Sequence, residues 1–309
     1  MPRILLILLA SLICLTPASA KPSLLQRGFA VTRDVVFLIQ PTEVAKLALF
    51  DERGKWITSV GTEEPNQPDS IIAPVELVTD SGGLCYVLDQ FGPSVIVVGH
   101  DGKVLRRWGA RGDEPGQMRQ PIDFGLDSHN ILWVLDPGRK AIIKFDTSGR
   151  FLSEVLLGTD SLRDLAWSNC IAVGPEGDFA VIADQPEGDI LRNVRFFDAF
   201  GVAGAQWTLG KIAESGEIQD ALLRADGSLL FADTQAAAGG AYRGAIYRFT
   251  GSGDYDQRWM LEEPRTGRSF TPVRIKQLGG VLYVLTQTNV VCRLDETGAI
   301  VQTWGAGEL

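Results

Sequence analysis

The chain has 309 residues, a formal net charge of -9 and a hydrophobic content of 45%. An acidic chain without a block of Lys or Arg is a poor match for nucleic acid or an anionic membrane surface, so we expect neither as a partner. The length and the hydrophobic content are sufficient for a packed core without disulfide bonds.

Residues 1–20, MPRILLILLASLICLTPASA, predict a cleavable signal peptide. Arg3 precedes an apolar run, and the segment ends in small residues before Lys21. Pro17 ends the run short of the roughly 20 apolar residues that a membrane span needs. We therefore expect a secreted or periplasmic protein whose mature chain, residues 21–309, has no transmembrane segment.

Six similar units follow the signal peptide, at about residues 23–61, 73–109, 121–158, 168–210, 218–261 and 272–305. A turn glycine recurs at intervals of 45 to 52 residues, at Gly54, Gly102, Gly149, Gly201, Gly253 and Gly298. The end of an apolar run recurs with nearly the same period, at Gln40, Asp89, Asp136, Asp184, Asp233 and Thr286. Two markers with one period predict a repeat protein.

The third unit shows what each unit contains. Its apolar runs are IDFGL, ILWVLD, AIIKFD and FLSEVLL, and the breaks between them are DSHN, PGRK and TSG. β-Branched and aromatic runs with turn residues between them predict a four-stranded antiparallel meander. Such sheets must stack face to face around an axis, so we expect an all-β, six-bladed β-propeller as a single domain. Large residues six positions after the turn glycine should pack between outer strands, at Trp108, Trp207, Trp259 and Trp304, with Val60 and Val155 in the other units.

Residues 109–121, GARGDEPGQMRQP, followed by VLD and then KFDTSGRFL, resemble the NHL-repeat family of six-bladed propellers. In that family a glycine-rich linker of this pattern joins an outer strand to the next inner strand. Met118 stands where the family has an aromatic residue. The resemblance covers roughly residues 73–158, and it implies the same six-bladed fold.

The predicted loops differ between the two faces of the ring. Turns between strands one and two, and between strands three and four, are short. The longer connections, at residues 62–72, 110–120, 185–193, 234–244 and 261–271, should all emerge on the opposite face. Long loops on one face are where repeat proteins usually bind, so we expect this long-loop face to carry function.

The starts of the inner strands should converge at the central channel on that face. Counting back thirteen residues from the end of strand two gives Glu76, Asp123, Ile171 and Asp220, and counting back twelve in the last unit gives Arg274. Hard cations such as calcium bind several oxygen ligands, so Glu76, Asp123 and Asp220 are candidate ligands of a divalent cation. The simpler interpretation, to which we give the greater weight, is that these acids are solvated or accept hydrogen bonds from inner-strand backbone.

Other chemistry finds little support in the sequence. The aspartates that end the second strands, Asp89, Asp136, Asp184 and Asp233, should accept hydrogen bonds from the following turn. His100 and His129 are the only histidines and fall in tight turns. The mature chain keeps Cys85, Cys170 and Cys292, which we expect to be buried free thiols.

Three functions remain open. The first is a non-enzymatic, monomeric module that binds a protein, peptide or glycan through the long-loop face. Its candidate contact residues are Arg119, Tyr242, Arg243, Arg265 and Phe270. The second is a metal-dependent hydrolase or lyase, distantly similar to the gluconolactonase-type propellers, in which Arg274 would orient an anionic group. The third is a purely structural module in a larger assembly.

Overall fold

The computed structural model describes residues 28–40, 46–62, 67–157, 168–184, 192–209, 217–236, 242–262, 267 and 269–305. The predicted signal peptide, residues 1–20, lies outside these ranges. Every regular element in the described part of the chain is a β-strand, which confirms the all-β prediction. None of the described segments forms a helix long and apolar enough to cross a bilayer.

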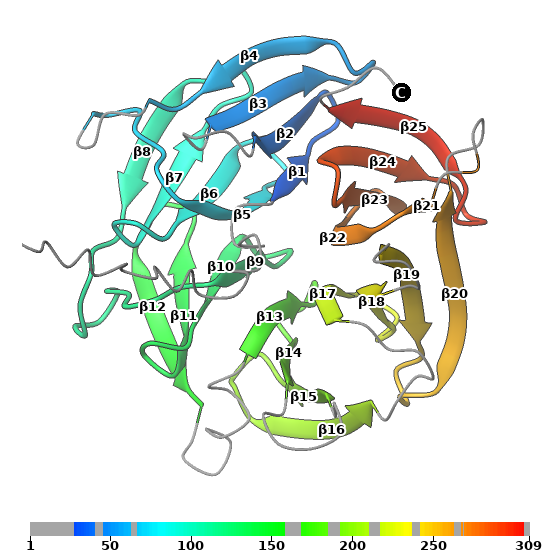
Figure 1. The fold of residues 1–309 in the computed structure, drawn as a ribbon. Helices are drawn as coiled ribbons and strands as arrows, with labels where there is room; N and C mark the ends of the chain where they lie inside the picture. The colour runs from blue at the N-terminus through cyan, green and yellow to red at the C-terminus, as the bar shows by residue number, and fades with distance from the viewer. Residues whose placement is uncertain are drawn as a thin grey trace, which may run out of the picture.

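The strands form six antiparallel sheets around a central space, which is the expected six-bladed propeller (Figure 1). Blade 1 contains β1 (Phe29–Val31), β2 (Val35–Gln40), β3 (Lys46–Asp51) and β4 (Trp56–Val60). Blade 2 contains β5 (Pro74–Thr79), β6 (Cys85–Asp89), β7 (Ser94–Val98) and β8 (Val104–Trp108). Blade 3 contains β9 (Asp123–Leu126), β10 (Ile131–Asp136), β11 (Ala141–Asp146) and β12 (Phe151–Leu156).

The last three blades repeat this order. Blade 4 contains β13 (Ser168–Val173), β14 (Phe179–Asp184), β15 (Arg192–Phe197) and β16 (Ala203–Leu209). Blade 5 contains β17 (Glu217–Leu223), β18 (Leu229–Ala236), β19 (Tyr242–Phe249) and β20 (Tyr255–Glu262), and β21 (Ser269–Phe270) pairs with β20 as a fifth strand. Blade 6 contains β22 (Pro272–Leu278), β23 (Val281–Thr286), β24 (Val290–Leu294) and β25 (Ile300–Gly305). In each blade the first strand faces the centre (Figure 1).

The two sequence markers meet at each boundary between blades. A Cβ atom placed on Gly149 of blade 3 would lie 2.5 Å from Cγ of Trp108 in blade 2, and the same contact joins Gly253 to Trp207 and Gly298 to Trp259. Val60 and Val155 occupy the equivalent position against Gly102 and Gly201. The turn glycines have φ between 82° and 94°, a region that only glycine adopts easily. The period of the sequence therefore reflects one packing contact, between a turn glycine and a large side chain of the neighbouring blade, that recurs at each boundary between blades.

Apolar side chains fill the space between blades. The described residues contain six hydrophobic clusters, and each cluster draws its members from two neighbouring blades. The sheets thus bury both faces against each other, as a ring of stacked sheets must. The cluster between blades 6 and 1 contains Trp304, Leu285, Phe29 and Leu38.

In the described part of the chain, blades 1 and 6 each supply all four of their own strands, so the ring closes there without an exchanged strand. Trp304 Nε1 of blade 6 donates to the carbonyl oxygen of Asp51 in blade 1 at 3.0 Å. Asn289 Nδ2 donates to the carbonyl oxygen of Ile39 at 3.2 Å. Side chains therefore join the first and last blades.

Candidate functional site

One residue near the start of each inner strand faces the centre of the ring. These residues are Gly28, Glu76, Asp123, Cys170, Asp220 and Arg274, and we call them the inner ring. In four blades the inner-ring residue pairs with the residue just before the marker at the end of the second apolar run (Asp89, Asp136, Asp233 or Thr286), as Glu76 does with Leu88 and Asp220 with Ala232. A β-bulge precedes Glu76, Cys170, Asp220 and Arg274. A bulge turns a side chain away from the regular alternation of the strand.

The fourth blade corrects the sequence analysis, which placed Ile171 in the inner ring. The bulge in β13 lies opposite residues one position earlier in strand two than in the other blades, so Cys170 pairs with Ile182 and occupies the inner-ring position. Ile171 instead packs with Trp133 and Leu135 of blade 3. A count of residues cannot detect a bulge that shifts by one position.

Two inner-ring aspartates bind the backbone of the next blade. Asp123 Oδ2 accepts a hydrogen bond from Ile171 N at 2.9 Å, and its Oδ1 accepts one from Phe124 N at 2.8 Å. Asp220 Oδ2 accepts a hydrogen bond from Ile275 N at 2.8 Å. The acids therefore fasten neighbouring inner strands, as one of the two interpretations of the sequence expected.

Arg274 joins three blades. Its Nε donates to Glu76 Oε2 at 2.6 Å and its Nη1 to the carbonyl oxygen of Gln219 at 2.8 Å. Blade 1 lies between blades 6 and 2, and its inner-ring residue is Gly28, where a Cβ atom would come within 3.1 Å of Glu76 Cα. The missing side chain at Gly28 leaves room for the arginine to reach Glu76.

Lys276, which the sequence analysis did not select, completes this network. Its Nζ lies 3.0 Å from Glu76 Oε1, and the carboxylate itself is only 1% exposed. Lys276 follows Arg274 by two residues, so both side chains leave the same side of β22. This alternation was the signal in the sequence that could have identified the lysine.

The charges of the inner ring strongly perturb one another. Burial, reinforced by Glu76 and Asp220, raises the pKa of Asp123 to about 8. Burial also raises the pKa of Asp220. For Lys276, burial alone would lower the pKa, but Glu76, Asp220 and Asp123 outweigh it and raise the pKa above its usual value. The three carboxyl groups thus exceed the two cations, Arg274 and Lys276, by one charge when all are ionised.

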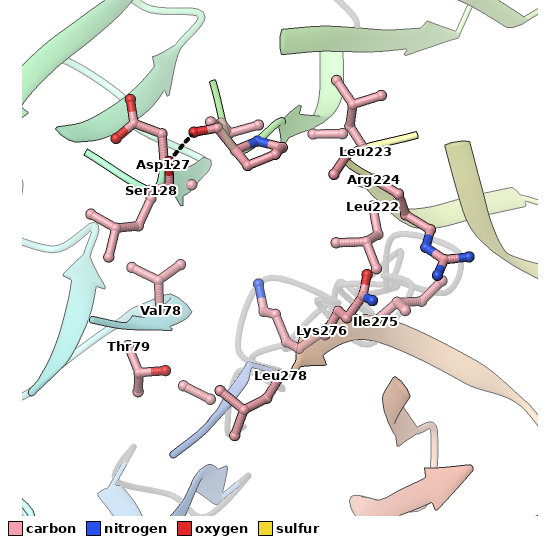
Figure 2. Close-up of a pocket in the computed structure, with 18 of the residues that line it drawn as sticks. Val78, Thr79, Asp127, Ser128, Leu222, Leu223, Arg224, Ile275, Lys276 and Leu278 are labelled. Carbon is pink, nitrogen blue, oxygen red and sulfur yellow. Dashed lines mark hydrogen bonds between the residues drawn. The ribbon is translucent and has the colours of Figure 1, made fainter. Parts of the chain in front are cut away.

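A cavity of about 760 Å³ occupies the centre of the propeller. One end of the cavity, which we call its inner end, lies at the starts of the inner strands and is lined by Asp123, Asp220 and Lys276. The other end lies at the turns between strands one and two, such as those of Ser81 and Gly279. Figure 2 shows the Lys276 ammonium directed toward the centre, with Val78, Leu222 and Leu278 on the walls. The walls are mainly apolar, and the few charged groups are concentrated at defined points.

The position of this cavity corrects the prediction about the two faces. From the sequence we expected the acids to meet at a channel mouth on the long-loop face. Glu76, Asp123 and Asp220 do converge, but they are buried, at 1%, 6% and 4% exposure. The cavity that reaches Asp123 and Asp220 extends toward the face of the short turns instead. The physical reason is that the acids lie at the starts of the inner strands, and the channel stays wide along the rest of their length.

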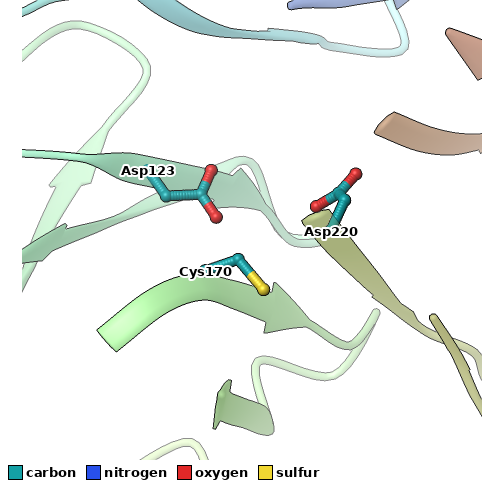
Figure 3. A group of neighbouring side chains, drawn as sticks. All are labelled: Asp123, Cys170 and Asp220. Carbon is teal, nitrogen blue, oxygen red and sulfur yellow. The ribbon is translucent and has the colours of Figure 1, made fainter. Parts of the chain in front are cut away.

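The acidic residues offer a mixed set of possible metal ligands. Among the described residues, Asp123, Cys170 and Asp220 present ligand atoms that all lie within 4.8 Å of one another (Figure 3). Glu76, the third predicted ligand, is paired with Arg274 and Lys276 instead. Calcium prefers six to eight oxygen ligands, so two carboxylates, a thiol and two nearby cations are a poor match for it.

The acids that end the second strands have a structural role in the two blades where their contacts are described. Asp136 accepts hydrogen bonds from Arg119 N at 2.6 Å, Gln120 N at 2.9 Å and Arg139 N at 3.1 Å. Asp89 accepts equivalent bonds from Ile72 N and Ala73 N. These aspartates therefore hold the incoming linker as well as the following turn. The side chain of Asp184 lies outside the described residues.

The predicted contact residues of the long-loop face differ in whether their side chains are exposed. Arg119 is exposed and forms an ion pair with Asp113. Phe270 is buried at 2% exposure, because β21 pairs with β20 and carries its side chain into the core between blades 5 and 6. The prediction that Phe270 is an exposed anchor is therefore wrong. Tyr242 begins β19 instead of lying in a loop. Its side chain, that of Arg243 and the whole of Arg265 lie outside the described residues.

Histidine and cysteine residues lie where the sequence placed them. His100 and His129 are exposed at turns. Cys85, Cys170 and Cys292 are buried and not disulfide-bonded. Burial raises the pKa of Cys85 and Cys292. Such thiols pack as small apolar groups and are poor nucleophiles.

Comparison with known proteins supports the fold. Residues 67–175 match a family model described as a 6-bladed beta-propeller. Human NHL repeat-containing protein 3 is 28% identical over 122 residues, which are 36% of this chain and 32% of that protein. The match thus spans about a third of the length of this curated relative. The chain is a six-bladed β-propeller with NHL-like repeats.

Solved structures of several propellers are similar in fold. Hydrazine synthase from Kuenenia stuttgartiensis matches with a TM-score of 0.60 and 16% identity, over 91% of this chain and 79% of that chain. Virginiamycin B lyase from Staphylococcus aureus matches with a TM-score of 0.56 and 13% identity, over 93% and 87%. At these identities the likeness concerns the fold alone.

Proposed function

We propose that the mature chain is an exported, non-enzymatic propeller that binds a small ligand in its central cavity. The observation that supports this proposal most directly is the cavity of about 760 Å³ with apolar walls and charged groups at its inner end. Small-molecule sites in proteins have this size and this character. Export is part of the proposal because of the predicted signal peptide.

A macromolecular partner on the long-loop face is a second candidate. The long connections support it, and a protein, peptide or glycan would be the partner. Of the predicted contact residues only Arg119 has a described and exposed side chain, and Asp113 already pairs with it. We therefore place ligand recognition in the cavity and treat the long-loop face as an additional surface.

A metal-dependent hydrolase or lyase is the alternative from another class. The grouping of Asp123, Cys170 and Asp220 favours it. A histidine-to-alanine variant of virginiamycin B lyase is described as catalytically inactive, whereas both histidines of this chain lie in exposed turns. If this alternative holds, calcium or zinc should raise the melting temperature and elemental analysis should find one ion per chain. We expect neither.

A substitution that fills the cavity tests the proposed function. Figure 2 shows Leu222 on the cavity wall, so Leu222→Trp should occupy part of the volume. Leu105, an exposed residue of the outer strand β8, provides the matched control Leu105→Trp. Ligand-observed NMR with a library of small fragments should detect bound fragments with the unaltered protein and with the control. The Leu222→Trp protein should lose most of them while keeping its melting temperature. Equal fragment binding by all three proteins would contradict the proposal.

A further inference from the structure

We propose that the ligand of the central cavity is an organic cation, with a primary ammonium group on an apolar body. The ammonium would lie between the carboxylates of Asp123 and Asp220. This inference rests on the proposed function, because it names the class of ligand for the same cavity. It is carried by the charges, the distances and the wall residues of the cavity.

The charged residues that line the cavity are mostly acidic. Among the described residues, five carboxyl groups line it, at Asp80, Asp123, Asp127, Asp220 and Asp226, and two cations, Arg224 and Lys276. Three of the acids lie at the rim and already have partners: Asp80 accepts from Tyr86 Oη, Asp127 from Trp133 Nε1, and Asp226 pairs with Arg248. Asp123 and Asp220 lie at the inner end, where they accept backbone hydrogen bonds but form no ion pair with a described residue, so they are the acids that a ligand ammonium would meet.

The resident cations leave this inner end short of positive charge. Lys276 and Arg274 both contact Glu76, at 3.0 Å and 2.6 Å. Figure 2 shows the Arg224 guanidinium directed away from the centre of the cavity. Two cations thus serve three buried carboxyl groups, Glu76, Asp123 and Asp220. A buried carboxylate without a compensating cation is costly, and Asp123 accordingly keeps its proton up to about pH 8, its pKa in the folded protein. A ligand ammonium would supply the missing positive charge, so Asp123 would release that proton when the ligand binds.

The distance between the two acids suits one ammonium group. Figure 3 shows the carboxylates of Asp123 and Asp220 directed toward each other, and an oxygen of each lies within 4.8 Å of the other. A charged N–H···O hydrogen bond is about 2.8 Å long. One nitrogen between the two oxygens can therefore donate to both. Cys170 lies beside them and adds no positive charge.

The walls indicate the rest of the ligand. Val78, Leu222 and Leu278 present aliphatic side chains to the cavity. An alkyl chain would be removed from water against them. Quaternary ammonium groups are recognised by several aromatic rings, but Phe124 is the single aromatic residue among the described residues that line the cavity. A primary ammonium, which can donate hydrogen bonds to carboxylates, therefore fits better than a quaternary one.

Four probes of one chain length test the inference with the full-length mature protein. Hexylamine, hexanol, hexanoate and hexyltrimethylammonium are titrated at pH 7.5 and constant ionic strength, and dissociation constants are measured by NMR. Hexylamine should bind at least ten times more tightly than the other three. Similar affinities for all, or a preference for hexanoate or the quaternary probe, would overturn the inference and leave cavity binding intact. No binding of any probe would overturn the proposed function as well.

Two substitutions locate the ammonium. In Asp220→Asn the amide oxygen can still accept from Ile275 N, so the fold is kept while one negative charge is lost. It should weaken hexylamine at least tenfold. Asp101→Asn removes the same charge from an exposed turn and should have no effect. Lys276→Met removes the resident cation and should strengthen hexylamine binding. A weaker hexylamine complex in Lys276→Met, or an unchanged one in Asp220→Asn, would contradict the placement.

Discussion

At the scale of single residues, the inner ring shows how a propeller handles charge at its centre. Glu76, Asp123 and Asp220 are buried, yet each accepts a backbone hydrogen bond, and Glu76 also forms an ion pair with Arg274. Buried acids with partners are tolerated, whereas an unpaired buried charge is strongly destabilising. Asp123 nevertheless has a strongly raised pKa, of about 8, because it is buried and has acidic neighbours.

The raised pKa of Asp123 predicts a specific dependence of stability on pH. In the unfolded chain this carboxyl titrates near 3.8 and in the folded protein near 8. Between these values the folded state holds a proton that the unfolded state has lost, so the contribution of Asp123 to stability falls as pH rises. The groups facing it are Glu76, Asp220, Arg274, Lys276 and Cys170.

Melting curves of the unaltered protein and Asp123→Asn between pH 5 and pH 9 check this prediction. The variant should be less stable at pH 5, because its amide oxygen can accept one of the two backbone hydrogen bonds of Asp123 while its amide nitrogen, a donor, cannot accept the other. The gap between the two melting temperatures should narrow steadily up to about pH 8 and then stay constant. A gap that does not change with pH would show that Asp123 is already ionised at pH 5.

At the scale of elements, the blade interface depends on the contact between a turn glycine and a large residue of the preceding blade. The turn between strands three and four carries the glycine, and the same register shift accompanies it in all six blades. Both the positive φ and the close approach exclude a side chain there. Gly83 offers a comparison, since it has φ of 85° but nothing within 4 Å of a Cβ atom.

Two alanine substitutions separate backbone strain from packing. Gly83→Ala should cost about 1 kcal/mol, the strain of a positive φ alone. Gly149→Ala should cost about 1–3 kcal/mol more, because its Cβ atom would lie 2.5 Å from Trp108 Cγ. Urea unfolding measures both. Equal costs would mean that Trp108 moves aside freely and that the contact does not hold the blades in place.

Features that repeat in every blade could be predicted from the sequence. Features in which one blade differs from the others could not. The period of the glycines predicted the sheets, and the spacing from strand two brought Glu76, Asp123, Asp220 and Arg274 to one place. A one-residue shift of the bulge in β13 concealed Cys170. Phe270 was misplaced because a two-residue strand, β21, added itself to blade 5. The face toward which the cavity extends depends on how the width of the channel varies along its axis. No local sequence pattern indicates that width.

At the scale of the whole molecule, closure of the ring brings residues of different blades together at the candidate site. No single blade contains the cluster of Asp123, Cys170 and Asp220, since its members come from β9, β13 and β17. Arg274 further ties blade 6 to the carbonyl oxygen of Gln219 in blade 5 and to Glu76 in blade 2. The cavity therefore exists only when all six blades are in place.

A crystal structure of the mature protein with hexylamine tests the central claim most directly. The account predicts a closed ring of six blades, with the probe in the cavity and its nitrogen within hydrogen-bond distance of Asp123 and Asp220. Carboxylates that point apart, or a probe bound on the long-loop face with the cavity empty, would contradict it.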